Sequence, residues 1–199
     1  TTYATFRLTS ILLQHEYQMV LNTGITGSLN RDLTIGEVVN VISEQFADWG
    51  IEQKDEFLTL FEADFIGLND FPFENGMLRA TESNGWIPWK EVNGITTNKS
   101  PGNISSINEI NRKFGADVES TEGAAIFFVT KHLGIPCFEI KAVSNYVEPR
   151  DASKWNIPLA LTNLKTALLK LLDNISEYQN FPGWFDRAGN VNHWVPGSF

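Results

Sequence analysis

The sequence has little cysteine, no long apolar run and no nucleotide-binding glycine motif. Cys137 is the single cysteine in 199 residues, which excludes an internal disulfide framework and favours a reducing compartment, so we expect a cytoplasmic protein. No apolar stretch approaches the roughly 20 residues that cross a bilayer as a helix. The phosphate-binding loop of ATPases and the dinucleotide fingerprint do not occur, and three scattered histidines do not form a zinc pattern. We therefore expect no metal and no cofactor.

The acidic balance of the chain argues against a polyanionic partner. The formal net charge is −9 at pH 7 and the pI is about 4.8, which disfavours nucleic acid and anionic membranes as partners. With 42% hydrophobic and 20% charged residues, the chain has the composition of one compact domain. Between positions 44 and 64 the acidic side chains predict a solvated surface in preference to a metal site. These are Glu44, Asp48, Glu52, Asp55, Glu56, Glu62 and Asp64.

Helix-like and strand-like segments alternate along the chain, which predicts an α/β domain with a mixed sheet. We expect helices over 1–15, 104–114, 123–133 and 156–177, and strands over 18–21, 33–43 and 137–143. Residues 22–28 have the composition of a turn. In the last helix, seven leucines suggest a broad apolar face that packs on the sheet.

Two features leave alternatives open. The aromatic residues of the Pro- and Gly-punctuated region 68–92, which include Phe71, Phe73, Trp86 and Trp89, either wall a substrate pocket, from this or a partner subunit, or fill the core between loop and sheet. Cys137 lies in an expected core strand, where a buried hydrophobic thiol is favoured over a nucleophile.

The stretch from Val118 to Asp151 holds the strongest candidate site. An acidic turn at 119–122 precedes a small-residue helix start, and the following strand ends at Ser144 and Asn145. Because ligands bind outside the carboxyl ends of strands in open α/β sheets, this polar pair is placed for a site. A helix that begins at Glu122 would face the same pocket.

The motif Glu122-Gly123-Ala124-Ala125, followed by Ser144-Asn145, resembles the nucleoside phosphorylase/nucleosidase superfamily. Asn145 lies 23 residues after Glu122, the spacing of the ribose and purine contacts in that superfamily. Within it, the run from Ser144 to Asp151 with Trp155 resembles the futalosine hydrolases. The resemblance implies a three-layer nucleoside phosphorylase-like fold, with a central mixed, partly barrel-like sheet flanked by helices. It also implies a nucleoside substrate and a homodimer or larger homo-oligomer.

The resemblance assigns roles that fit the chemistry of N-ribosidic hydrolysis. Glu122 and Asn145 are the candidate catalytic residues: a carboxylate favours the cation that develops on the ribose, and an amide stabilises the departing base. Asn145 both donates and accepts hydrogen bonds, which suits a 6-oxopurine better than adenine. The structural alternatives are a helix-start acid for Glu122 and a turn cap for Asn145. The candidate substrate-binding residues are Thr26, Gly27, Thr97, Asn98, Thr121 and Ser144.

Functional expectations follow from the same resemblance. The favoured reaction is hydrolysis of futalosine to hypoxanthine and dehypoxanthine futalosine, a step toward menaquinone. The alternatives are a purine nucleoside phosphorylase, an enzyme like the methylthioadenosine/S-adenosylhomocysteine nucleosidases, or an inactive nucleoside-binding domain. We expect residues 1–177 to form the nucleosidase-like domain, without its N-terminal strands and their water-activating glutamate, and 178–199 to be a tail without an assigned role. Lys141 takes the place of a family arginine, and Arg150 with Asp151 suggests an ion pair that closes a loop.

Overall fold

A mixed six-stranded sheet forms the centre of the structure, a computed structural model that describes residues 1–54 and 56–177. The strand order is β5-β2-β6-β7-β1-β8, and a further pairing of β2 with β8 closes the sheet into a barrel-like ring. Its strands are β1 (Val20–Ser28), β2 (Val38–Phe46), β5 (Leu78–Arg79), β6 (Lys90–Thr96), β7 (Val118–Ser120) and β8 (Cys137–Tyr146); β3 (Gly50–Gln53) and β4 (Glu56–Thr59) form a separate hairpin. The predicted mixed, barrel-like sheet is confirmed.

The two longest strands bring distant parts of the sequence to one edge. β1 and β8 run parallel, from the pair Val20 and Cys137 to the pair Ser28 and Tyr146. Their carboxyl ends therefore meet, although more than a hundred residues separate them in the chain. β7 pairs antiparallel with the end of β1, which places Glu119 opposite Gly27. The start of the helix that follows β7 consequently lies beside the ends of β1 and β8.

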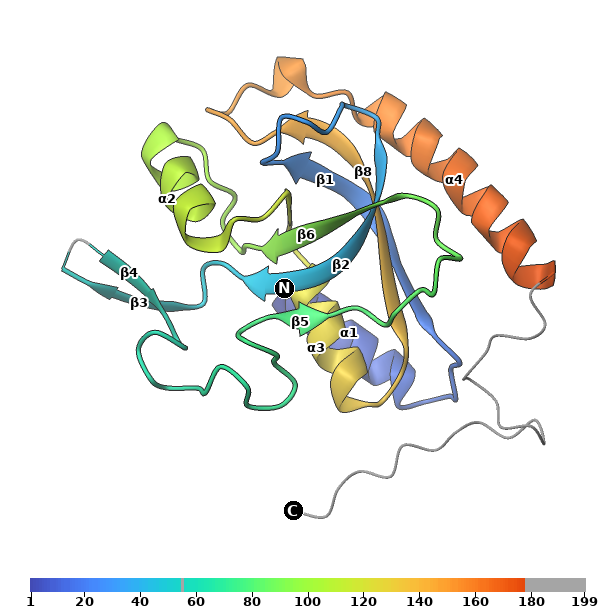
Figure 1. The fold of residues 1–199 in the computed structure, drawn as a ribbon, viewed down its shortest axis with the longest axis horizontal. Coiled ribbons are helices and arrows are strands. Elements are labelled where there is room, and N and C mark those ends of the chain that lie inside the picture. Colours follow the sequence, from blue (N-terminus) through green and yellow to red (C-terminus); the bar gives the residue numbers. More distant parts are fainter. Residues whose placement is uncertain (55, 178–199) are drawn as a thin grey trace, which may run out of the picture.

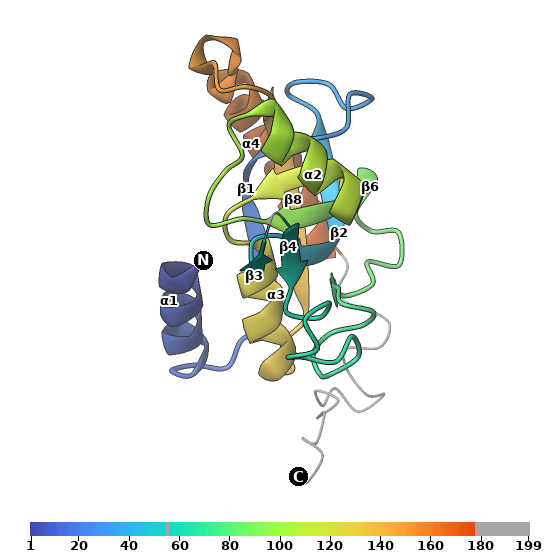
Figure 2. The ribbon, with the colours of Figure 1, turned by 90° about the vertical axis from the view of Figure 1, so that its left-hand side faces the viewer.

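Helices cover the sheet on more than one side (Figure 1). They are α1 (Thr2–Leu12), α2 (Ile104–Phe114), α3 (Gly123–His132) and α4 (Ile157–Glu177), with a short 3-10 turn at Ala152–Lys154. α4 packs on β8, β1 and β2, whereas α3 contacts β6, β2 and β8, and α1 packs against α3 (Figure 2). All four predicted helices are present. Among the described residues, no helix combines the length and the apolarity needed to cross a membrane.

The apolar face of α4 is narrower than the leucine content predicts. The buried stripe is formed by Ala160, Leu164, Ala167 and Leu171, at the spacing of one helix face. Four leucines that we expected on the packed face are exposed instead: Leu159, Leu161, Leu169 and Leu172. Alanines at two of the four contact positions let the helix approach the sheet closely, so fewer large side chains are needed to seal it.

Two segments interpreted as turns are strands. Residues 22–28 belong to β1 and pair with β8 on one side and β7 on the other, while Glu119 and Ser120 belong to β7. Ladder hydrogen bonds to flanking strands outweigh the local preference of Gly, Asn and Ser for turns, because strand preference depends strongly on context. Both corrections place polar side chains on the sheet.

The aromatic region supports the core-packing alternative except at Phe71, which is 60% exposed. Phe73 packs in a cluster with Leu78 and Phe127, and Trp86 and Trp89 pack against the cluster around Phe138. The surface prediction for the acidic residues is wrong at one position, because Glu44 is 1% exposed in the middle of the sheet. β2 pairs with β5, β6 and β8, so little of its surface reaches solvent. Asp55 and the predicted tail 178–199 lie outside the described residues.

Candidate functional site

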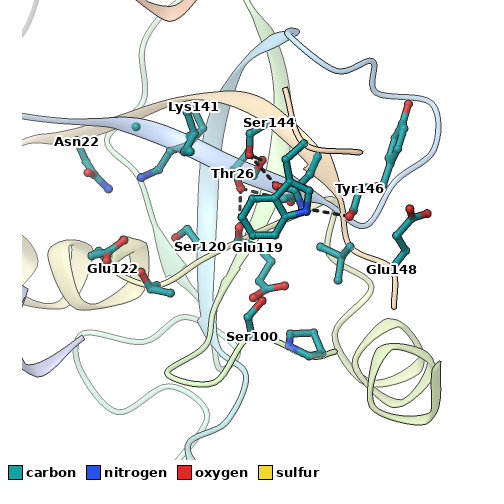
Figure 3. A pocket seen from close by; sticks show the side chains of 18 of the residues that line it. Asn22, Thr26, Ser100, Glu119, Ser120, Glu122, Lys141, Ser144, Tyr146 and Glu148 are labelled. Atoms are coloured by element: carbon teal, nitrogen blue, oxygen red, sulfur yellow. Dashed lines mark hydrogen bonds between the residues drawn. The ribbon is translucent and has the colours of Figure 1, made fainter. Parts of the chain in front are cut away.

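A pocket of about 570 Å³ opens at the carboxyl ends of β1 and β8 (Figure 3). This volume is within the range that binds a small organic ligand. The walls come from β1, β7, β8, the start of α3, the loop before α2 and the loop after β8. The lining residues are Asn22, Thr23, Gly24, Ile25, Thr26, Gly27, Ser100, Pro101, Glu119, Ser120, Thr121, Glu122, Ile126, Lys141, Ser144, Asn145, Tyr146, Val147, Glu148, Arg150 and Trp155.

Glu122 and Asn145, the two candidate catalytic residues, line the same pocket. Glu122 is the N-cap residue of α3, and the hydroxyl of Thr121 donates a hydrogen bond to its carboxylate. Asn145 is the last but one residue of β8. The folding of strand and helix toward one edge therefore brings together two groups that lie far apart in the sequence.

Neighbouring groups fix the orientation of the Asn145 amide. The hydroxyl of Ser144 donates to Asn145 Oδ1 at 2.7 Å and lies 3.1 Å from the carbonyl oxygen of Thr26. Asn145 Nδ2 donates to the carbonyl of Tyr146 at 3.0 Å. An amide oxygen has two lone pairs and an amide nitrogen has two hydrogens. Asn145 therefore retains one acceptor position and one donor position for a ligand.

Thr26 and Gly27 lie on the opposite wall, on β1. The hydroxyl of Thr26 is buried and donates to the carbonyl of Glu119 at 2.7 Å, which ties β1 to β7. At Gly27, a Cβ atom would lie 2.9 Å from Val147 and 3.3 Å from Asn145 Nδ2. Only glycine allows the Asn145 side chain to lie against β1 in this way, so Gly27 shapes the pocket through what it leaves open.

Thr97 and Asn98 do not line the pocket. The Thr97 hydroxyl donates to Glu119 Oε1 at 2.9 Å, and Asn98 Nδ2 donates to Asp48 Oδ1 at 3.1 Å. These bonds hold the Thr97 side chain on Glu119 and the Asn98 side chain on Asp48. The same loop reaches the pocket further along, through Ser100 and Pro101.

Sequence reasoning missed Glu119 and gave Lys141 too small a role. Glu119 is buried in the pocket wall, and burial raises the pKa of its carboxyl group while hydrogen bonds from Ser100 and Thr97 oppose the rise. Lys141 is buried as well and lies on the pocket wall. Its place two residues after Glu139 was a usable signal, because residues at even spacings in a strand share a face, and the two side chains lie 3.3 Å apart. Within the described ranges, no group of three or more His, Cys, Asp or Glu side chains is arranged to hold a metal ion.

The loop after β8 is held differently from the predicted Arg–Asp pair. The Arg150 guanidinium lies 5.3 Å from the centre of the Trp155 ring. Asp151 accepts hydrogen bonds from the backbone and hydroxyl of Ser153 and caps the 3-10 turn. Arg150 and Trp155 both face the pocket, so this end offers a cationic group over an aromatic surface.

Comparison with known proteins places the chain in a family. Residues 2–173 match the model of the phosphorylase superfamily, and the chain belongs to that superfamily. It is 31% identical over 155 residues to the futalosine hydrolase of Streptomyces coelicolor, covering 78% of this chain and 65% of that protein. It is 27% identical over 184 residues to the futalosine hydrolase of Thermus thermophilus, covering 90% and 80%.

A solved structure shows the same fold. The futalosine hydrolase of Helicobacter pylori superposes with a TM-score of 0.73 at 20% identity, covering 87% of this chain and 75% of that one. The chain spans about two thirds of the length of the Streptomyces relative, 65%.

Proposed function

We propose that this chain carries the site of a nucleosidase that hydrolyses the N-ribosidic bond of futalosine and releases hypoxanthine and dehypoxanthine futalosine. The observation that carries the proposal is the meeting of Glu122 and Asn145 in one pocket. Similarity to two proteins named futalosine hydrolase supports the choice of substrate. Among the sequence-predicted residues, Thr26, Gly27, Thr121 and Ser144 complete the proposed site.

Glu122 is proposed to bind the ribose. Its carboxylate accepts hydrogen bonds from sugar hydroxyls, and its negative charge favours the positive charge that develops on the ribose as the bond breaks. Glu122 stands at the start of α3 and lines the pocket. Thr121 orients it by donating a hydrogen bond from the adjacent residue.

Asn145 is proposed to stabilise the departing purine. Its remaining donor position fits the 6-oxo group, and its remaining acceptor position fits a protonated N7. Adenine presents a 6-amino donor beside N7, so it would leave the free amide hydrogen of Asn145 facing another donor. The two bonds made by Ser144 and Tyr146 hold the amide in the orientation that this recognition requires. A site with such paired groups rejects a ligand that leaves them unpaired.

The test measures, by chromatography, the release of hypoxanthine from futalosine. The assay uses this chain and, beside it, the protein as the source cells produce it. Asn145→Ala serves as the inactive control. Hypoxanthine release without phosphate is expected from an active form.

Three other outcomes would contradict the proposal. Release that requires phosphate would identify a phosphorylase. Faster release of adenine from methylthioadenosine than of hypoxanthine from futalosine would identify a nucleosidase of the adenine type. Nucleoside binding in a calorimeter without turnover by either form would identify a binding domain. Homo-oligomer formation and a cytoplasmic location stay predictions; analytical ultracentrifugation and fractionation of the source cells test them.

A further inference from the structure

Two buried glutamates lie behind the pocket wall and have no part in the proposed reaction. Glu44 on β2 is 1% exposed and Glu139 on β8 is 0% exposed. Neither side chain lines the pocket. Burying an ionised carboxylate is unfavourable unless charges and hydrogen bonds compensate it, so the contacts of this pair decide how many negative charges it carries.

Each carboxyl group uses one oxygen to hold a part of the pocket. Glu139 Oε1 accepts a hydrogen bond from Asn22 Nδ2 at 3.0 Å and lies 3.3 Å from Lys141 Nζ. Glu44 Oε2 accepts from the Thr96 hydroxyl at 2.8 Å, and the Thr96 oxygen accepts from the backbone N–H of Ala124 at 2.7 Å. Glu139 thus holds two residues of the pocket wall, whereas Glu44 holds the first turn of α3.

The other oxygen of each group lies beside Gly123, at the start of α3. A Cβ atom on Gly123 would lie 2.9 Å from Glu139 Oε2 and still closer to Glu44 Oε1. Two side-chain oxygens from different strands therefore approach the same point beside Gly123. Within the described residues, Glu139 Oε2 is a buried oxygen without a hydrogen-bond partner. The nearby Glu44 carboxyl group would supply that partner if it carried a hydrogen.

The charges around the pair favour one proton rather than none. Burial and the negative charge of Glu139 raise the pKa of Glu44 well above its usual value. Burial also raises the pKa of Glu139, but the adjacent Lys141 ammonium opposes that rise. The negative charge of Glu122, the N-cap residue of α3, acts on both groups, and Cys137 on β8 lies near Glu139. β1 and β6 contribute the neutral Asn22 and Thr96.

We propose that Glu44 and Glu139 share a single proton, carried by Glu44, and that the Glu139 carboxylate is thereby kept as a positioning residue for Lys141 and Asn22. The protonated Glu44 donates to Glu139 Oε2 and accepts from Thr96. Figure 3 shows Lys141 reaching toward Asn22 and Glu122 on the pocket wall. The effect on turnover rests on the proposed function, whereas the protonation state does not.

The protonation state is tested by carbon NMR of the full chain with labelled glutamate carboxyl groups. At pH 7, one carboxyl resonance is expected at the position of a protonated acid, and it should disappear in Glu44→Gln. A spectrum of the folded protein with every carboxyl ionised at pH 7 would overturn the proposal. Loss of the resonance in Glu139→Gln with retention in Glu44→Gln would overturn the assignment of the proton to Glu44.

Thermal unfolding tests the holding of Lys141. Glutamine at position 44 replaces a protonated acid by a neutral donor of the same shape, so Glu44→Gln is expected to change the melting temperature little. Glu139→Gln removes the charge beside the buried Lys141 ammonium and is expected to lower the melting temperature by roughly 10 °C. Adding Lys141→Met to Glu139→Gln should recover much of that loss. Equal losses in the two single variants would contradict the proposal.

Turnover tests the positioning role, with Glu91→Gln on the exposed part of β6 as the matched control. Glu139→Gln is expected to lower kcat/KM about 10- to 100-fold, because small displacements of binding groups have large effects on rate. Glu44→Gln should lose less. An active wild type whose Glu139→Gln variant matches Glu91→Gln would overturn the role. If the wild type releases no base, the proposed function fails, while the NMR and unfolding results still decide the protonation state.

Discussion

Replacing Gly123 by alanine is expected to destabilise the protein, although the same change usually stabilises a helical position. Gly123 is the first residue of α3 and has no left-handed backbone, so alanine brings no backbone strain and would normally gain about 0.4–1 kcal/mol through the unfolded chain. Its Cβ, however, would lie 2.9 Å from Glu139 Oε2 and closer to Glu44 Oε1. Neither carboxyl group moves freely, because Glu44 is bonded to Thr96 and Glu139 to Asn22.

Overpacking of this kind destabilises by about 1–3 kcal/mol, which leaves a net loss of about 0–2.6 kcal/mol with a midpoint of about 1.3 kcal/mol. For a domain of this size that midpoint corresponds to a fall in melting temperature of about 3–5 °C. Gly102→Ala is the matched control, because a Cβ there meets nothing within 4 Å, and it is expected to keep or raise the melting temperature. Circular dichroism melts of both variants measure the difference. A Gly123→Ala protein at least as stable as Gly102→Ala would refute the proposed close packing of the two glutamates against α3.

Three further predictions concern single side chains. Asn145→Ala should slow hypoxanthine release through a loss of about 2–4 kcal/mol of transition-state stabilisation. Asn145→Asp should shift the product from hypoxanthine toward adenine when both nucleosides are offered. Unchanged product ratios by chromatography would remove Asn145 from base recognition. Because burial raises the pKa of Glu119 above its usual 4.5, the folded protein binds that proton more tightly than the unfolded chain, and stability falls as pH rises from about 4.5 through the raised value. Glu119→Gln lacks this fall, so the melting temperature of the variant should rise relative to that of the wild type as pH increases. Melting temperatures of the two proteins that change in parallel with pH would contradict the raised pKa of Glu119. Burial raises the pKa of the Cys137 thiol to about 12, so a chromogenic disulfide reagent at pH 8 should react with it only after unfolding, and rapid reaction of the folded protein would show that the thiol is accessible.

Local patterns in the sequence were sufficient for the helices. α2 begins and ends as predicted because Asn103 accepts a hydrogen bond from the Ser106 N–H and Gly115 adopts the left-handed conformation that ends a helix. Such signals act within a few residues and need no tertiary context. The superfamily resemblance likewise depended on short motifs, and it identified Glu122 and Asn145 as a pair before their pocket was known.

Burial of charged residues was beyond the reach of local patterns. Glu44 stands near other acidic residues in the sequence, so we interpreted it as a surface residue. It lies on β2, however, and β2 pairs with three other strands, which bury it. Glu119 was assigned to a turn, whereas its pairing with β1 makes it part of the pocket wall. These pairings join segments far apart in the chain, so no window of sequence contains them.

The amino-acid sequence alone therefore indicated the four helices. The superfamily resemblance that it carries indicated the mixed barrel-like sheet and the two candidate catalytic residues. Only the tertiary structure decided which carboxyl groups lose contact with water and which cation faces them. The physical reason is that hydrogen-bonded caps and side-chain periodicity are properties of neighbouring residues, whereas desolvation is a property of everything that surrounds a group in space. Gly123 illustrates both kinds of information. It is the first residue of a helix that local sequence predicts, and its missing side chain leaves room for Glu44 and Glu139 in the tertiary structure.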